Sequence, residues 1–442
     1  MSGKPIIKDL GAGLILRRSS PADADALAEF CGLIHSEVPG KSDDIIASWT
    51  RDLLTRPHPT FHADDFTVVE ETATGRIVST LNLISQTWTY DGIPFKVGRP
   101  ELVGTLPEFR NRGLIRLQFD EIHRWSAERG ELVQAITGIP FYYRLFGYEM
   151  ALDLDGARTG FEMNLPSLEA GESEPYIFRP AGEADIPFMT EVYNDSCMRY
   201  PIACVRDAAL FRYELFGRSK TVAAVFRVIE NVNGEPVGML RHLPVLGKNG
   251  MTIMLYELKP GCSWLDVTPS LVRYLWKTGQ EYSKLEGRPC TAFTFWVGES
   301  HPVYEVFKER LPHIHPSYAW YLRVADLPGF IKHIAPALEK RLAVSIASGY
   351  SGEKRVSFYS NGLRLVFNNG RLSVIEPWKP GSGELEGDIA FPGLTFLQLL
   401  FGYRSLEELR KSFADCWWNS NETRALFNAL FPKKPSQLYP VS

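Results

Sequence analysis

The sequence predicts an α/β (α+β) protein with two similar units of mixed sheet and flanking helices, followed by a small α+β domain. The segments that begin the two units resemble each other: LILRRSSPADADALAEF returns as YIFRPAGEADIPFMTEVY, and Ile15 and Ile177 lie 162 residues apart. In each segment an extended apolar run ends in Arg, and a short turn then leads through Ala-Asp into an amphipathic helix. Tyr143 and Tyr304 keep nearly the same offset, at 161 residues. A repeat of this length predicts one duplicated structural unit.

Length and composition narrow the class of protein. A chain of 442 residues is long enough for several domains. Its net charge of -4 gives no general reason to expect nucleic acid or a membrane as a partner. The six cysteines lack the paired spacing of a zinc site or a disulfide framework, and the histidines near residues 301–315 lack partners at a ligand spacing. From these spacings we expect no metal site. Because no signal peptide or membrane span is recognisable, we expect a cytoplasmic protein.

Hydrophobic patterning orders the elements of the first unit. We expect a strand ending near residue 17, helices over 22–54, strands over 66–70, 77–89 and 97–106, a helix over 114–128, a strand over 132–137, a short helix over 140–146 and a strand over 148–154. The second unit repeats this order over residues 176–324, after the linker PSLEAGESEP. The third segment has a helix over 327–342, hairpins with Asn-Gly turns, and further helices. The expected domains are 1–165, 174–324 and 325–442.

The stretch LPEFRNRGLIRLQFDEIHRWSAERG lies where an expected strand meets an expected helix. The first N–H groups of a helix are unpaired and carry a partial positive charge, and Gly113 lets a ligand approach the backbone closely. Arg110 and Arg112 add charge, and Asn111 offers a side-chain hydrogen bond. The joint therefore predicts an anion site, most simply for a phosphate.

In its context this joint resembles the pyrophosphate-binding motif of GNAT-superfamily acyltransferases, Arg/Gln-x-x-Gly-x-Gly/Ala. An apolar strand ending in Leu-Pro precedes it and FYYRLFGYEMAL follows it. Ile115 stands where most members carry Gly or Ala, and this Gly-Leu-Ile ending is similar to the enhanced intracellular survival (Eis) acetyltransferases. Those enzymes have two tandem GNAT units and a sterol-carrier-protein-like C-terminal domain. The resemblance therefore implies two tandem GNAT folds, the second one degenerate, and a sterol-carrier-like domain over 325–442.

The same resemblance implies acetyl-CoA as co-substrate and assigns residues to it. Its pantetheine arm would lie along the backbone of the strand before the loop, and Gly138 and Ile139 would complete the cleft. The implied contacts are Leu102, Val103, Gly104, Thr105, Arg110, Asn111, Arg112, Gly113, Leu114, Ile115, Gly138 and Ile139.

Direct attack of an amine on a thioester needs a group that protonates the leaving thiolate and a group that takes a proton from the amine. Tyr143 matches the tyrosine that the family uses as the acid, with its neighbour Tyr142 as the alternative. One candidate base is Glu101, on the strand that leads to the loop. The other is the terminal carboxylate of Ser442, because Eis-like enzymes use their terminal carboxylate. Ser442 is preferred, since the apolar residues before it are able to dock in a cleft.

The second unit lacks the anion motif. Its counterpart, YELKPGCSWLDVTPSLVRYL, has no Arg-x-x-Gly at the strand-helix joint, so we expect it to bind no coenzyme A. The expected activity is acetyl transfer to the amine of a cationic small molecule, such as an aminoglycoside, or of a lysine side chain. The alternative is a non-catalytic protein that binds acyl-CoA or lipid. The Eis resemblance also implies a ring-like homo-oligomer of six copies.

Overall fold

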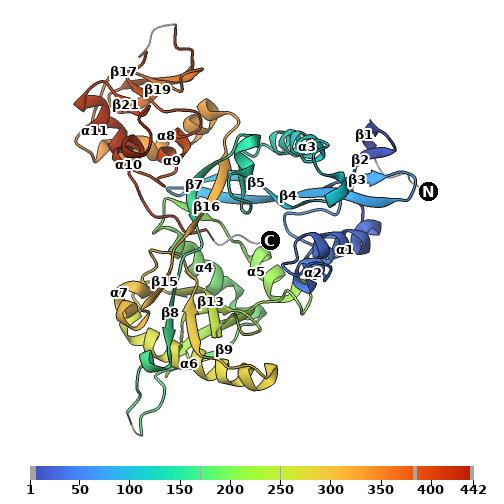
Figure 1. The fold of residues 1–442 in the computed structure, drawn as a ribbon. Coiled ribbons are helices and arrows are strands. Elements are labelled where there is room, and N and C mark those ends of the chain that lie inside the picture. Colours follow the sequence, from blue (N-terminus) through green and yellow to red (C-terminus); the bar gives the residue numbers. More distant parts are fainter. Residues whose placement is uncertain (1–5, 170, 249, 382–385, 439–442) are drawn as a thin grey trace.

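Three sheets with packed helices make up the protein (Figure 1). The computed structural model describes residues 6–169, 171–248, 250–381 and 386–438. The fold class expected from the sequence is confirmed, because the sheets are mixed and helices flank them. Within these ranges, no helix combines the length and the apolar character that crossing a bilayer requires.

The first sheet carries the anion motif. Its strands run in the order β1 (Ile6–Gly11), β2 (Leu14–Arg18), β3 (Phe66–Glu71), β4 (Arg76–Tyr90), β5 (Ile93–Thr105), β6 (Val133–Ile136), β16 (Tyr318–Arg323) and β7 (Glu149–Leu154), and β10 (Ile202–Cys204) extends the edge of β4. Helix α3 (Leu114–Glu128) covers one face, and α1 (Ala24–Ile34) and α2 (Asp44–Thr55) cover the other (Figure 1). A short 3-10 helix, Tyr142–Phe146, lies between β6 and β7.

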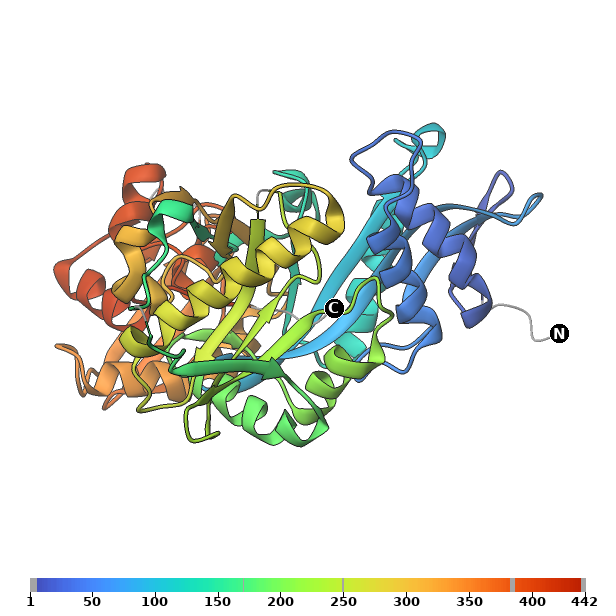
Figure 2. The ribbon, with the colours of Figure 1, turned by 90° about the horizontal axis from the view of Figure 1, so that it is seen from below.

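The second sheet has the order β15 (His313–His315), β8 (Ala157–Phe161), β14 (Ala292–Phe295), β13 (Gly250–Leu258), β12 (Pro236–His242), β11 (Val225–Asn231) and β9 (Tyr176–Pro180). The long helix α6 (Trp264–Glu286) lies along this sheet (Figure 2). Its other helices are α4 (Ile186–Cys197), α5 (Ala208–Arg212) and α7 (Val303–Phe307).

Two strands exchange between these sheets, which differs from the expected layout. β8 follows the first unit in the chain yet pairs with β14 and β15, and β16 ends the second unit yet pairs with β6 and β7. Hydrophobic patterning predicts that a segment is a strand, but only long-range contacts decide which sheet it joins. The boundaries at 165, 174 and 324 stay predictions, and the exchange makes the two sheets interdependent.

The repeat seen in the sequence has a structural counterpart at the start of each unit. Arg17 pairs with Asp23 at 2.8 Å and with Glu70 at 2.5 Å. Arg179 pairs with Asp185 at 2.7 Å and with Glu230 at 2.6 Å. In both units the Asp also accepts a hydrogen bond from the backbone N–H three residues before it, at 2.8 Å. The same ion network thus joins β2 or β9, the short turn before the first helix and a neighbouring strand in each half.

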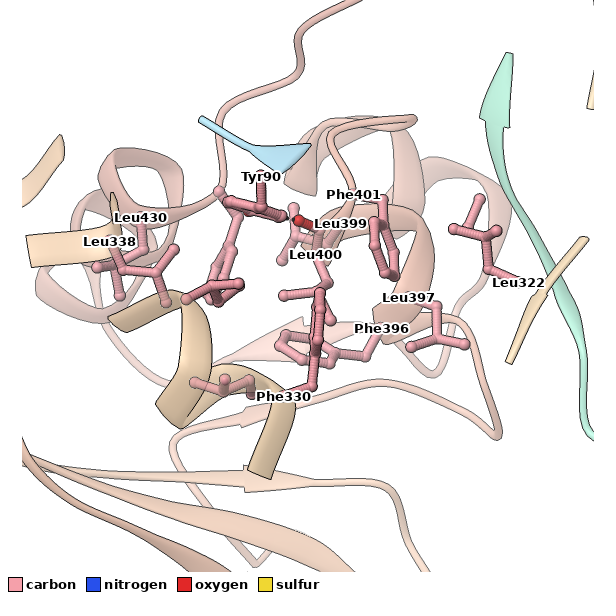
Figure 3. Close-up of a cluster of buried hydrophobic side chains, with 14 of the residues drawn as sticks. Tyr90, Leu322, Phe330, Leu338, Phe396, Leu397, Leu399, Leu400, Phe401 and Leu430 are labelled. Carbon is pink, nitrogen blue, oxygen red and sulfur yellow. Dashed lines mark hydrogen bonds between the residues drawn. The ribbon is translucent and has the colours of Figure 1, made fainter. Parts of the chain in front are cut away.

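The third body packs against the first sheet through a shared core. Its sheet has the order β19 (Arg371–Trp378), β18 (Gly362–Asn368), β17 (Gly352–Ser357), β20 (Ile389–Ala390) and β21 (Trp417–Trp418), with helices α8 (Leu327–Ala343), α9 (Phe396–Leu400), α10 (Leu406–Ser412) and α11 (Asn421–Leu430). Tyr90, from the tip of the β4–β5 hairpin, lies among Phe330, Leu400 and Phe401 (Figure 3). Its hydroxyl donates to the Leu400 carbonyl at 2.7 Å. Arg341 of α8 pairs with Asp91 of the same hairpin at 2.6 Å, so the hairpin is fixed in the third body.

Candidate active site

A bulge in β5 marks the centre of the site. The pairing of β4 with β5 shifts register between Thr80 and Asn82, and Leu102 takes a φ of 53°. β5 therefore carries an extra residue at this point, which bends the strand. The parallel ladder between β5 and β6 ends at Gly98, while the other edge of β6 stays paired with β16 as far as Ile136. The two strands diverge beyond Gly98 and leave a gap between them.

The joint between β5 and α3 is open. Gly113 takes a φ of 74° and precedes the first helical residue, and none of the described side chains caps the helix. A Cβ placed on Gly113 would meet no atom within 4 Å. The backbone N–H groups of the first turn are therefore available to an anion.

Two arginines flank this helix start, and both are exposed. Arg110 Nε donates to the carbonyl of Thr105 at 3.3 Å. Arg112 donates to the carbonyl of Glu108 at 3.0 Å, and its guanidinium lies 4.7 Å from the centre of the Phe109 ring. These contacts use part of each guanidinium and orient it, while both side chains remain exposed to a ligand.

A cavity of about 650 Å³ joins the helix start to the gap between the strands. Most of the residues expected to hold the co-substrate line it: Val103, Gly104, Thr105, Arg110, Asn111, Arg112, Gly113, Leu114, Ile115 and Ile139. The walls are completed by Ile34 at the end of α1, by His35 after it, and by Tyr142, Leu145 and Phe146. The structure thus brings the strand, the loop and the segment after β6 together around one space.

Leu102 and Gly138 lie outside the lining of this cavity. The side chain of Leu102 is buried among residues of α1 and α2, which is where the bulge turns it. Gly138 takes a φ of 121°, and a Cβ there would lie 3.4 Å from the hydroxyl of Tyr143. Both residues shape the backbone around the gap, and their own side-chain positions face away from the cavity.

A buried glutamine fixes the open helix to the sheet. Gln118 of α3 accepts from the Thr67 hydroxyl at 3.0 Å and donates to the Ser79 hydroxyl at 2.7 Å. Ser79 in turn donates to the carbonyl of Gly104 at 2.9 Å. The position of α3 is therefore coupled to the strand that lines the cavity. Gln118 was not singled out from the sequence. Its position was a usable signal, because a polar side chain one helical turn after Leu114 interrupts the apolar face of the helix.

Tyr143 and Glu101 approach the gap from different elements. Tyr143 is buried, and the described residues offer its hydroxyl no hydrogen-bond partner. Burial raises the pKa of Tyr143, and the negative charge of Glu101 raises it further. Glu101 itself forms an ion pair with Arg99. Tyr142, the alternative acid, lines the large cavity, and burial raises its pKa as well.

A second cavity, of about 330 Å³, lies between the first and second sheets. Arg99 and Thr137 contribute to it from the two sides of the gap, and Trp296 and Trp320 contribute aromatic walls. It contains charges of both signs: Arg218 and Arg241 beside Glu214, and Asp153 and Asp155 where the chain crosses between sheets. Burial raises the pKa of both aspartates. Such a mixed lining suits a polar ligand.

The tail of the chain returns to this second cavity. Gln437 forms a parallel bridge with Ala203, and Gln437 and Leu438 line the space. Ser442, the other candidate base, lies outside the described residues.

Comparisons with known proteins agree with this geometry. Residues 39–151 match the model of an acetyltransferase (GNAT) domain. No curated protein sequence matches the chain significantly.

Solved structures match the chain over nearly all its length. A probable N-acyltransferase from Enterococcus faecalis V583 has a TM-score of 0.69 at 12% identity, over 97% of this chain and 100% of that one. A GCN5-related N-acetyltransferase from Kribbella flavida has a TM-score of 0.65 at 16% identity, over 96% and 97%. Eis1 from Mycobacterium abscessus has a TM-score of 0.58 at 14% identity, over 97% and 99%. At these identities the matches show a shared fold. Residues 39–151 therefore match a GNAT acetyltransferase domain, and the chain as a whole shares the fold of these solved structures.

Proposed function

We propose that the protein transfers an acetyl group from acetyl-CoA to a primary amine. The observation that carries this proposal is the cavity of about 650 Å³, which joins the uncapped helix start at Gly113 to the gap between β5 and β6. The donor set fits coenzyme A: backbone N–H groups and two arginines suit a diphosphate, and the diverging strand offers backbone groups to a pantetheine arm.

The residues around the gap suit direct transfer to the amine. Acetyl-CoA supplies an electrophilic thioester carbonyl, which the lone pair of the neutral amine attacks. Glu101, placed next to the second cavity through its partner Arg99, takes the proton that the amine loses. Tyr143 gives its phenolic proton to the departing sulfur. Its raised pKa keeps the phenol protonated at neutral pH, as an acid requires.

The second cavity is our proposed entrance for the acceptor, because it meets the gap at Arg99 and Thr137. Asp153 and Asp155 are carboxylates at its wall, and a cationic amine would pair with them. This supports a cationic small molecule, such as an aminoglycoside, or a lysine side chain as the acceptor. Arginines line the same cavity, so the acceptor site is selective for how charge is arranged on the molecule.

Two measurements test the proposal. Acetyl-CoA should raise the melting temperature of the purified protein, since a ligand that binds only the folded state stabilises it by mass action. An assay for released thiol, run over a panel of polyamines, aminoglycosides and lysine peptides, should then find an acceptor. Stabilisation without thiol release from any amine would leave a binding protein and remove the proposed reaction.

A specific observation favours a lipid-binding role as the second candidate. The third body contains a cavity of about 350 Å³ whose lining is almost entirely apolar, including Leu327, Phe358, Leu363 and Phe396. This supports the sterol-carrier-like interpretation of residues 325–442. Displacement of a fluorescent fatty acid by natural lipids would measure such binding, and Phe358→Glu should abolish it. If lipid binds and no amine is acetylated, this candidate replaces the first.

A further inference from the structure

Asn82 is a buried amide at the centre of the site. Its side chain is 0% exposed, and neither Nδ2 nor Oδ1 has a hydrogen-bond partner among the described residues. Two other buried polar side chains of the same sheet are bonded: the Thr80 hydroxyl donates to the Thr67 carbonyl at 2.9 Å, and Gln134 donates to the Ser126 hydroxyl at 2.7 Å. A buried amide without partners destabilises the fold, so its presence calls for a physical explanation.

The position of Asn82 supplies that explanation. It pairs directly across the β4–β5 ladder with Glu101, at the residue where the register shifts around the bulge. Directly opposed residues in an antiparallel pair have Cβ atoms about 4.5–5.5 Å apart and point to the same face. The amide of Asn82 is therefore the cross-strand neighbour of the carboxylate that we propose as the base.

The strand pattern confirms which face this is. Leu81 and Leu83 pack with Phe119 of α3, whereas Ile84 packs with the residues of α1 and α2. Because side chains alternate along a strand, Asn82 shares the face of Ile84, away from α3. Arg99 pairs with Ile84 across the ladder and lies on that face too.

A second unpartnered polar group flanks the same ion pair. Trp320 of β16 is 1% exposed, and its Nε1 has no hydrogen-bond partner among the described residues. The Arg99 guanidinium lies 5.2 Å from the centre of its ring, and Trp320 lines the cavity proposed for the acceptor. Buried polar groups without partners thus stand on both sides of the Arg99–Glu101 pair, where a reaction would use them.

We propose that Asn82 is a positioning residue for acetyl transfer. In the loaded enzyme its Nδ2–H donates to the carboxylate of Glu101, which holds that carboxylate ionised and directed at the acceptor amine. Hydrogen bonds of this kind are often long before substrates bind and tighten in the reacting complex. The inference rests on the proposed function, because Glu101 is the base only if that reaction takes place.

A donor to the ionised form of a carboxyl lowers its pKa, so loss of the donor raises it. The acidic limb of the kcat/KM profile should then move toward neutral pH. This shift separates a positioning role from a purely structural one.

The test is Asn82→Leu, which keeps the number and branching of the side-chain heavy atoms and removes both polar atoms. We expect the melting temperature to rise by about 2 °C, because the unpartnered amide is gone. We expect kcat to fall by about tenfold or more, with the KM for acetyl-CoA unchanged and the acidic limb shifted upward. Higher stability with lower activity is the signature of a residue kept for function.

Thr80→Val is the matched control on the same strand and face. It removes a buried hydroxyl whose hydrogen bond is made, so the melting temperature should fall while kcat and the pH profile stay as in the wild type. A lower melting temperature for Asn82→Leu would show that the amide holds the fold and would overturn the inference. An unchanged kcat and pH profile for Asn82→Leu would also overturn the inference, but it would not contradict the proposed acetyl transfer. If the wild type itself acetylates no amine, the proposed function fails, and the role of Asn82 fails with it whatever the melting temperature does.

Discussion

The long helices of the first and second sheets, α3 and α6, start at equivalent strand-helix joints, but the two helix starts differ in their chemistry. In the first, α3 starts at an uncapped Gly113 beside a cavity of about 650 Å³. In the second, the Ser263 hydroxyl caps α6 by accepting from the Asp266 N–H at 3.3 Å. Asp266 also places a carboxylate in the first turn, which repels an anion.

The second sheet differs in a second way: the gap between its parallel strands is filled. The ladder of β13 with β14 ends at Ile253, so these strands separate as β5 and β6 do. There His301 hydrogen-bonds the carbonyl of Tyr256 through Nε2 at 2.8 Å, and the space left is about 20 Å³. The comparison teaches that the duplicated frame alone provides no site. An uncapped helix and an unfilled gap are what make the first half a candidate for chemistry.

The largest expected effect tests the helix start. Gly113→Glu places a carboxylate where the diphosphate would lie, so acetyl-CoA should no longer raise the melting temperature. The wild type should gain about 2.7 kcal/mol at a hundredfold excess over Kd. Gly261→Glu is the matched control at the second joint, because Gly261 also has a positive φ and open space around it. Both variants carry similar backbone strain, and a loss of acetyl-CoA binding in the control would contradict the contrast between the two halves.

The next effect separates two equivalent tyrosines. Tyr143→Phe should lower kcat about 10²-fold with little change in stability, because its hydroxyl acts as an acid and has no hydrogen bond to lose. Tyr304 donates to the Phe295 carbonyl at 2.8 Å. Tyr304→Phe should therefore cost about 1 kcal/mol of stability and leave kcat unchanged. Steady-state kinetics and thermal unfolding of both variants measure this. Equal activity losses would show that Tyr143 acts through packing.

A smaller effect tests the filled gap. His301→Ala removes a buried hydrogen bond and leaves a cavity, so the free energy of unfolding should fall by about 2–3 kcal/mol. The variant should gain no second site for acetyl-CoA, since Ser263 still caps α6. Calorimetric titration counts the sites. A stoichiometry of two would mean that filling alone had blocked the second half.

The smallest effect per residue occurs in both halves. Burial lowers the pKa of His123 to about 3 and of His242 to about 4, with nearby arginines contributing. Both folded values lie below the unfolded value near 6.5, so the unfolded chain takes up protons first. Stability is therefore complete above about pH 6.5 and falls below it, by about 2 kcal/mol per histidine at pH 5. Melting curves over this range should show the decline, and His123→Gln should reduce its slope. A flat profile would mean that water reaches both rings.

Local features of the site were predictable from the sequence, and long-range features were not. Arg110 to Ile115 stood out because a strand end, a glycine and a helix start are all encoded within a few residues. The structure places these residues around one cavity, and their role with coenzyme A stays a proposal. Asn82 was invisible to that reasoning, because its meaning depends on Glu101 across a ladder and on the absence of bonds among the described residues.

Sheet membership was the other hidden feature. The apolar run at β16 fits a strand at the end of the second unit, whereas β8 was not expected as a strand, and nothing in either segment specifies a partner more than a hundred residues away. The same holds for Tyr90. In the sequence it is an ordinary aromatic residue of a hairpin, and only the structure shows that the third body surrounds it.

The exchanged strand β16 has a consequence for how the protein is made. It lies between β6 and β7, so the first sheet is incomplete until Tyr318–Arg323 is available. A nascent chain therefore reaches the end of its first half on the ribosome with an open row of backbone groups, long before the missing strand is synthesised. The first sheet can close only after residues 318–323 have emerged, well after β7 at Glu149–Leu154.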